Sequence, residues 1–186
     1  MILPIYTYGQ AVLRQVAEDI PTDYPGLDEL IENMYETMDH AEGVGLAAPQ
    51  IGLPIRVVVI SLDVLKEDFP EYAGFRHAYI NAHIVDADTS ETELITEGCL
   101  SLPGVSEPVR RPKRIRVQYL DENLQPHDEW VEGYLARVMQ HEFDHLEGHV
   151  FTDRITALRK QLVSKKLTSL AKGRFACGYK VKPARR

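Results

Sequence analysis

The fold of this 186-residue chain is decided by one short stretch, HEFDH at residues 141–145. The stretch lies inside a predicted helix over residues 134–147. Residues four apart share a helix face, so His141 and His145 can both reach one ion, and Glu142 lies beside them, within reach of a water molecule. The residues that share the sector of the two histidines are apolar: Leu135, Val138, Met139 and Leu146. The pattern therefore predicts a buried metal site on a central helix.

Two histidines do not complete a catalytic metal site, so a third ligand is needed. Well-known zinc peptidases place it downstream, as a histidine ten positions after the first or as a glutamate on a later helix. Here Phe151 stands at the first of these positions and no acidic residue follows Asp153, so neither arrangement fits. Upstream, Cys99 follows a predicted strand, and its thiolate would bind a divalent transition metal strongly. Cys177 has no histidine or acidic neighbour in the sequence and is interpreted as a small structural residue.

The remaining pattern predicts two further helices and several short strands. Apolar residues recur at helical spacing over residues 26–42 and 156–171. Runs of β-branched and aromatic residues predict strands, the last two joined as a hairpin, at 55–62, 78–85, 91–95, 114–120 and 127–131. Residues 63–76 are expected to form an exposed excursion beside the cleft. We therefore expect an α+β fold, with mostly antiparallel strands around the central HEFDH helix and a C-terminal helix.

The charge of the chain is unevenly distributed. The net charge is −7, yet all 28 acidic residues lie before residue 155, and residues 155–186 contain ten Lys or Arg. The length predicts a single catalytic domain over 1–174, followed by a basic C-terminal tail over 175–186. This balance excludes a protein that coats nucleic acid throughout, but it leaves a basic C-terminal patch.

Cysteine usage and hydropathy bear on the compartment. Two cysteines are too few for a disulfide scaffold, which favours a reducing environment. The first residues resemble neither a secretory signal nor a transit peptide, and no apolar run is long enough to span a membrane. We expect a cytoplasmic monomer without membrane contact.

Three segments together resemble one known family, the peptide deformylases. They are GVGLAAPQ at 43–50, EGCLS at 97–101 and QHEFDHLEG at 140–148. The resemblance implies removal of the N-formyl group from the formyl-methionine of nascent peptides, with release of formate. It implies one divalent metal ion held by Cys99, His141 and His145. That ion is usually Fe²⁺, which Zn²⁺, Ni²⁺ or Co²⁺ can replace.

The resemblance also assigns roles around the reacting amide. Glu142 would take a proton from the attacking water and pass it to the departing amine. The Gln50 side-chain amide and the Leu100 backbone N–H would donate to the formyl oxygen as it gains charge. Gly45, lacking a side chain, would let the substrate backbone pair with the protein like an added strand.

An apolar pocket should receive the methionine side chain. Our candidates for it are Val44, Ile95, Tyr134 and Val138. Arg137 departs from the apolar residue of many family members, and would either rim the pocket and contact the substrate backbone or point to solvent. Glu97 is counted with the pocket, and Glu97 or Asp144 could also accept the second N–H of a ligand histidine. Arg111 is expected to pair with Glu97.

Two other functions compete with this interpretation. One is a metallopeptidase of another class, which the missing downstream ligand disfavours. The other is a metal-stabilised RNA-binding module that uses the basic tail. Within the deformylase interpretation, the basic C-terminal segment would contact the ribosome near the exit tunnel, as in the family that the chain resembles.

Overall fold

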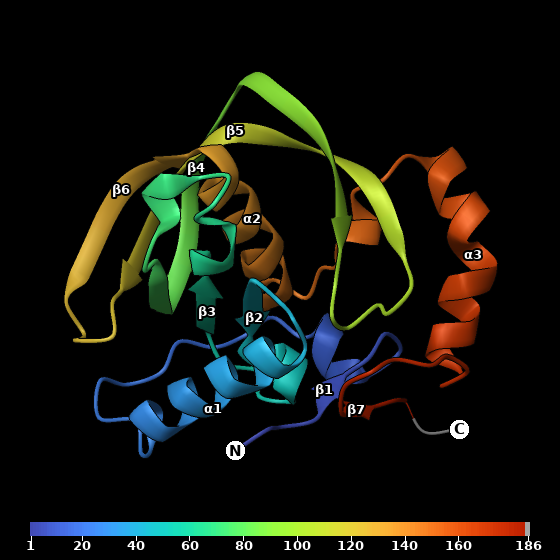
Figure 1. Cartoon of the computed structure of the whole chain (residues 1–186), viewed down its shortest axis with the longest axis horizontal. Helices are drawn as coiled ribbons and strands as arrows, with labels where there is room; N and C mark the ends of the chain where they lie inside the picture. The colour runs from blue at the N-terminus through green and yellow to red at the C-terminus, as the bar shows by residue number, and fades with distance from the viewer. Residues whose placement is uncertain (185–186) are drawn as a thin grey trace.

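The computed structural model describes residues 1–184, and its elements surround one central helix (Figure 1). That helix is α2, Gly133–Leu146, and ten of its fourteen residues are buried. Helix α3, Ala157–Ala171, buries only Val163, Leu167 and Leu170. Because α2 is enclosed on nearly every face while α3 has one buried stripe, α2 belongs to the core and α3 covers the surface.

A five-stranded sheet lies against α2. Its strands follow the order β2-β3-β4-β5-β6, and every neighbouring pair is antiparallel. They span Gly45–Ala47, Val57–Ser61, Arg76–Gly98, Ser106–Leu120 and Pro126–Glu132. The expected α+β fold, with a mostly antiparallel sheet around the HEFDH helix and a helix near the C-terminus, is confirmed.

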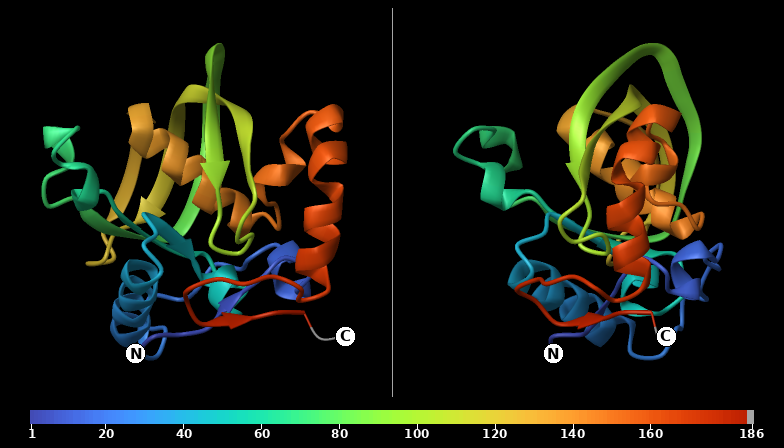
Figure 2. Two further views of the ribbon diagram at one scale, coloured as in Figure 1. Left: turned by 45° about the vertical axis from the view of Figure 1, so that its right-hand side comes forward. Right: turned by 90° about the vertical axis from the view of Figure 1, so that its right-hand side faces the viewer.

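The strands expected at 78–85 and 91–95 are one continuous strand, β4, so the predicted break between them was wrong. The intervening residues 86–90 are mostly polar or acidic, so no run of β-branched and aromatic residues marks a strand there. They nevertheless pair with basic residues of β5, Asp86 opposite Arg116 and Asp88 opposite Arg114, through several register shifts. The β4–β5 ribbon arches over the molecule, and β4 then leads back to Cys99 (Figures 1 and 2).

One glycine determines where α2 begins. Strand β6 ends at Glu132, and Gly133 follows with φ +71°, a left-handed conformation that costs glycine little. The chain can therefore turn from strand to helix within one residue. The position of this turn fixes the position of the histidines on α2.

Helix α1, Leu27–His40, packs on the other side of the sheet from α2. Its buried face joins β2 and β3 in one apolar cluster, while α2 and the opposite sheet face form a second. The excursion at 63–76 consists of two short 3₁₀ turns, Asp63–Leu65 and Pro70–Tyr72, and is largely exposed, as expected. Among residues 1–184, no helix has the length and apolar character that crossing a bilayer requires.

The two ends of the chain pair with each other, which the sequence did not predict. Strand β1, Ile5–Tyr6, runs parallel to β7, Val181–Lys182. The segment expected to be a basic tail, 175–186, is therefore partly built into the fold, through the pairing of residues 181–182. Residues 185 and 186 of that segment lie outside the described residues.

Candidate active site

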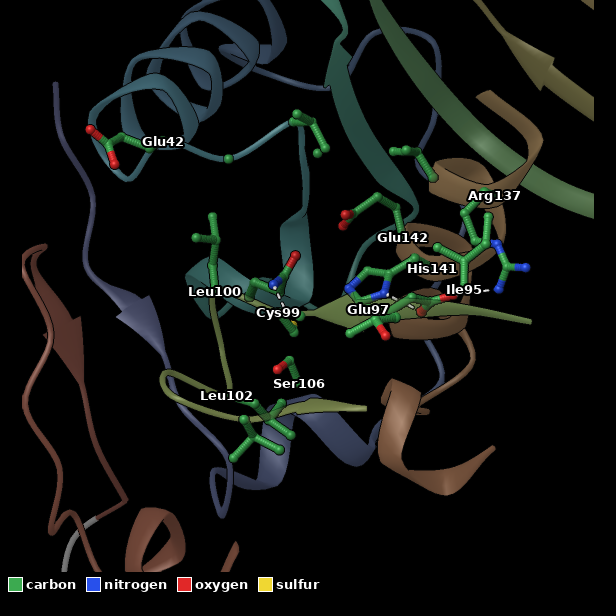
Figure 3. A pocket seen from close by; sticks show the side chains of 18 of the residues that line it. Glu42, Ile95, Glu97, Cys99, Leu100, Leu102, Ser106, Arg137, His141 and Glu142 are labelled. Atoms are coloured by element: carbon green, nitrogen blue, oxygen red, sulfur yellow. Dashed lines mark hydrogen bonds and ion pairs between the residues drawn. The ribbon is translucent and has the colours of Figure 1, made fainter. Parts of the chain in front are cut away.

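Three ligand-type side chains meet where β4 approaches α2. Cys99 follows directly on β4, while His141 and His145 lie one turn apart on α2. The ligand atoms of these three residues all lie within 4.8 Å of one another. Figure 3 shows Cys99, His141 and the neighbouring Glu142 turned toward the same space. The structure thus brings together the three predicted metal ligands.

The spacing of these atoms fits one tetrahedral ion. A thiolate about 2.3 Å and an imidazole nitrogen about 2.0 Å from such an ion lie about 3.5 Å apart. The Sγ of Cys99 and the Nε2 of His145 are 3.3 Å apart. His141 uses its Nδ1 on Glu97, which leaves its Nε2 for the same point. One sulfur and two imidazole nitrogens form a donor set suited to a divalent transition metal.

The local electrostatics favour the ligand form of the cysteine. Burial by itself raises the pKa of the Cys99 thiol, but the facing imidazoles of His145 and His141 outweigh burial and lower this pKa to about 5. At neutral pH the sulfur is therefore a thiolate. Burial tends to lower the pKa of His141, but its hydrogen bonds to Cys99 and Glu97 raise it well above the ordinary value. A cation at Nε2 would replace the proton that faces Cys99, while the Nδ1–H continues to donate to Glu97.

Glu97 orients His141 and has no capacity left for a substrate. Its Oε2 accepts from His141 Nδ1 at 2.8 Å and from Arg111 Nη2 at 2.9 Å. Its Oε1 accepts from Arg111 Nε at 2.6 Å and from Arg137 Nη1 at 2.9 Å. Burial tends to raise the pKa of Glu97, but the Arg111 and His141 hydrogen bonds hold it well below its usual range. Glu97 thus supports a ligand histidine and pairs with Arg111, as expected; it also lines the cleft, but with each oxygen accepting two bonds its carboxylate offers the substrate no free acceptor.

Arg137 corrects an expectation from the sequence. It neither points to solvent nor offers a free guanidinium to the substrate, because it is only 6% exposed. Besides Glu97, it donates to the carbonyl oxygens of Val109 at 2.9 Å and Glu93 at 2.8 Å. The side chain therefore holds α2 to β4 and β5. It lines the cleft, but its hydrogen bonds are made to Glu97 and to the two carbonyls.

Asp144 supports the metal ligands indirectly, through Arg111 and Glu97. It accepts from Arg111 Nη1 at 2.8 Å and Arg154 Nε at 2.6 Å, so it holds the arginine that holds Glu97. Neither ligand histidine donates to it among the hydrogen bonds of residues 1–184. Burial tends to raise the pKa of Asp144, but the two arginines lower it overall. The pairing of Arg154 with Asp144 was not predicted. A basic residue ten positions after Asp144 is only a weak signal for such a pair.

Glu142 lies against Gly45 with an unpaired oxygen. Its side chain is buried, and Oε2 has no hydrogen-bond partner in the described protein. Burial raises the pKa of Glu142 to about 7. A Cβ on Gly45 would lie 2.5 Å from Oε1 of Glu142. The structure thus supplies a more immediate reason for the glycine than substrate pairing: it makes room for the carboxylate.

Gln50 is held by the segment 97–101 and by its own turn. Its Oε1 accepts from Ala47 N at 2.9 Å, and its Nε2 donates to Ser101 Oγ at 3.2 Å and to Cys99 Sγ at 3.5 Å. The amide therefore faces the ligand cluster, next to Leu100. Ser101 is a site residue that we did not predict, although its hydroxyl stands two positions after the cysteine in the same motif.

Known proteins share this sequence and this arrangement. The family model described as polypeptide deformylase matches residues 2–161. The chain belongs to this family. A peptide deformylase of Flavobacterium psychrophilum is 47% identical, with 98% of this chain and 97% of the relative covered.

Solved peptide deformylases share the fold of this chain. The crystal structure of the Thermus thermophilus enzyme has a TM-score of 0.81 and 39% identity, covering 93% of this chain and 99% of that one. The deformylase from Synechococcus elongatus, solved in complex with actinonin, has a TM-score of 0.77 and 37% identity, covering 88% and 85%.

In this deformylase-family chain, a cleft of about 520 Å³ opens beside the ligand cluster. All six predicted pocket residues line it: Val44, Ile95, Glu97, Tyr134, Arg137 and Val138. Its opposite wall, which we did not predict, is formed by Leu102 and residues 104–106. Among the described residues, the excursion 63–76 contributes nothing to this lining.

Proposed function

We propose that Glu142, Gln50 and the Leu100 N–H carry out the reaction that defines the family. As a peptide deformylase, the enzyme removes the N-formyl group from formyl-methionine at the start of nascent peptides. The observation that carries the assignment is the buried Glu142 carboxylate, with Oε2 unpaired, beside a Cys, His, His ligand set. A base with a free oxygen at this position has a water molecule as its natural partner.

Water adds to the formyl carbon, and the bond from that carbon to nitrogen breaks. A divalent ion held by Cys99, His141 and His145 supplies Lewis acidity and lowers the pKa of water near it. Glu142 accepts the proton that the water loses and later delivers it to the departing amine, so formate and a free amino terminus result. Gln50 donates one amide hydrogen to Ser101; the other, which reaches the Cys99 sulfur at 3.5 Å, would turn to the formyl oxygen when substrate is bound.

The cleft offers the chemistry that a methionine side chain needs. Val44, Ile95, Tyr134 and Val138 provide apolar and aromatic surface next to the reacting atoms. An unbranched thioether packs well into such an irregular apolar pocket. We infer that these four residues select formyl-methionine over formylated polar residues.

For the ion, we infer Fe²⁺ in the cell, with Zn²⁺, Ni²⁺ or Co²⁺ as substitutes. The mixed sulfur and nitrogen donor set accepts all four ions, and the choice of Fe²⁺ follows from the family to which the chain belongs. Metal analysis of anaerobically purified protein tests this inference: iron at one equivalent supports it, and zinc alone contradicts it. We also infer a cytoplasmic location, because the substrates are nascent chains. We infer that the enzyme is a monomer, and a dimer by size-exclusion chromatography would contradict this.

The decisive experiment measures formate release from formyl-Met-Ala-Ser. The Ni²⁺-loaded enzyme should produce formate and free Met-Ala-Ser, and Glu142→Gln should lose at least about 10³-fold in kcat while retaining the metal. Internal peptide cleavage without formate would instead support another metallopeptidase class. Full activity of Glu142→Gln would remove Glu142 from the mechanism.

We further infer that α3 brings the enzyme to the ribosome. Lys160, Lys165 and Lys166 are exposed on this helix, whereas Arg159 is engaged by Glu107. Salt-sensitive co-sedimentation with ribosomes should weaken in a Lys165→Glu, Lys166→Glu variant. Charge reversal is a better test than truncation, because truncation also removes β7. Unchanged co-sedimentation would refute the contact.

A further inference from the structure

The loop that carries the Leu100 N–H is held by three hydrogen bonds, one for each successive peptide unit. The Cys99 carbonyl, which shares a peptide unit with the Leu100 N–H, accepts from Leu102 N at 2.9 Å. The Leu100 carbonyl accepts from the Tyr179 hydroxyl at 2.7 Å. The Ser101 carbonyl accepts from Tyr8 N at 2.8 Å. Each of these three carbonyls thus has one donor.

Peptide units are planar, so fixing a carbonyl fixes the N–H on the other side of the same unit. The two units that flank the Leu100 Cα are held by Leu102 and by Tyr179. Together they set both backbone dihedrals of Leu100. The direction of the Leu100 N–H therefore depends on the Tyr179 hydroxyl as well as on the local turn.

Tyr179 is well placed to act as a fixed donor. Its ring packs against the apolar cluster under α1, and the next residues are pinned to β1, with Ile5 N donating to Lys180 O at 2.9 Å. Burial raises the pKa of Tyr179, so its hydroxyl keeps its proton throughout the neutral range. Tyr179 also lies beyond residue 161, where the match to the family model ends.

We propose that Tyr179 is a positioning residue that aims the Leu100 N–H at the oxygen of the scissile amide. This inference rests on the proposed role of Leu100 as a donor to that oxygen. Tyr179 itself does not touch the substrate cleft, and it is not among the residues that line it. It acts from the C-terminal segment, through one backbone carbonyl.

The test compares Tyr179→Phe with Tyr24→Phe in the full-length Ni²⁺-loaded enzyme. Tyr24 is a matched control because it is half-buried against the same cluster, and its hydroxyl makes no hydrogen bond within residues 1–184. Tyr179→Phe should lower kcat for formyl-Met-Ala-Ser about three- to tenfold, less than the 10²–10³ lost when an oxyanion donor is removed. KM and metal content should match those of Tyr24→Phe, since the ring, pocket and ligands are unchanged.

A second measurement is independent of turnover. In the Zn²⁺-loaded protein labelled with ¹⁵N-leucine, the Leu100 amide resonance should shift or broaden in Tyr179→Phe and stay in place in Tyr24→Phe. The proposal is overturned if kcat is the same in the two variants, or if the Leu100 resonance does not respond. It is also overturned if the loss appears only in KM or only as a lower melting temperature. A wild-type enzyme that releases no formate would instead refute the proposed function itself.

Discussion

Gly45→Ala tests the close packing of Glu142 against β2. The added Cβ would lie 2.5 Å from Oε1, 2.7 Å from Cγ and 2.8 Å from Cδ of Glu142, whereas ordinary contacts begin at 3.4 Å. Three atoms of one buried side chain are affected at once, so the carboxylate must move by roughly 1 Å. A misplacement of this size typically costs about 10²-fold in rate.

The assay is formate release from formyl-Met-Ala-Ser, with metal content measured on the same sample. We expect kcat of Gly45→Ala to fall about 10²-fold with metal retained, because the three atoms nearest to the new methyl group all belong to Glu142 and none to a ligand residue. The loss should appear in kcat, since a displaced base affects the chemical step.

Gly98→Ala is the matched control. Gly98 lines the same cleft, but a Cβ there would meet only Val105 O, at 3.8 Å. This variant should keep kcat close to that of the wild type. Wild-type kcat in Gly45→Ala would refute the reasoning, because Glu142 would then tolerate the methyl group. Equal losses in both variants would refute it too, since crowding of the cleft would explain them.

Three further predictions concern pH, the metal and Arg137. Burial raises the pKa of Glu142 to about 7, and a bound cation lowers it. Because the base is protonated at low pH, kcat/KM should fall as the pH drops through a midpoint at or below 7. A midpoint above 7 in the pH profile would contradict this expectation. Removing the metal with a chelator should lower the melting temperature by about 5–15 °C, as measured by circular dichroism, because the ion binds only the folded ligand set; an unchanged midpoint would argue against a tightly bound ion. Arg137→Met should lower the free energy of unfolding in urea by about 2–3 kcal/mol, because the carbonyls of Val109 and Glu93 lose this donor. The metal should be retained, because Arg111 and Glu97 still hold His141. Undiminished stability would show that the Arg137 hydrogen bonds contribute nothing.

Much of the site could be predicted from the sequence, because its chemistry is concentrated in short segments. His141, Glu142 and His145 share one helical face whatever the rest of the fold, so their geometry follows from local spacing. Cys99 was found as the missing ligand, and the structure places it 3.3 Å from His145. These inferences needed helix periodicity and metal chemistry, together with a family resemblance.

What the sequence could not provide depends on contacts between distant segments. Glu97 acquires its three partners only when β4, β5 and α2 come together; the sequence indicated Arg111 and a ligand histidine, but not Arg137, which completes the set. Residues 86–90 were left outside the predicted strands because the basic partner strand that neutralises their charges lies more than twenty residues away in the sequence. Strand β7 is two residues long, and a run of that length has no periodicity to detect.

The pairing of β1 with β7 has a consequence for how this enzyme matures during its own synthesis. Because synthesis runs from the N-terminus, residues 5–6 leave the ribosome long before residues 181–182 do. Their pairing, and the hydrogen bond that the Tyr179 hydroxyl donates to Leu100, must wait until residue 182 has left the ribosome. The ligand helix, by contrast, is already complete at residue 146. A ribosome-bound chain that has not yet released residues 179–182 would thus contain the metal ligands and the base before its backbone donor is fixed in place.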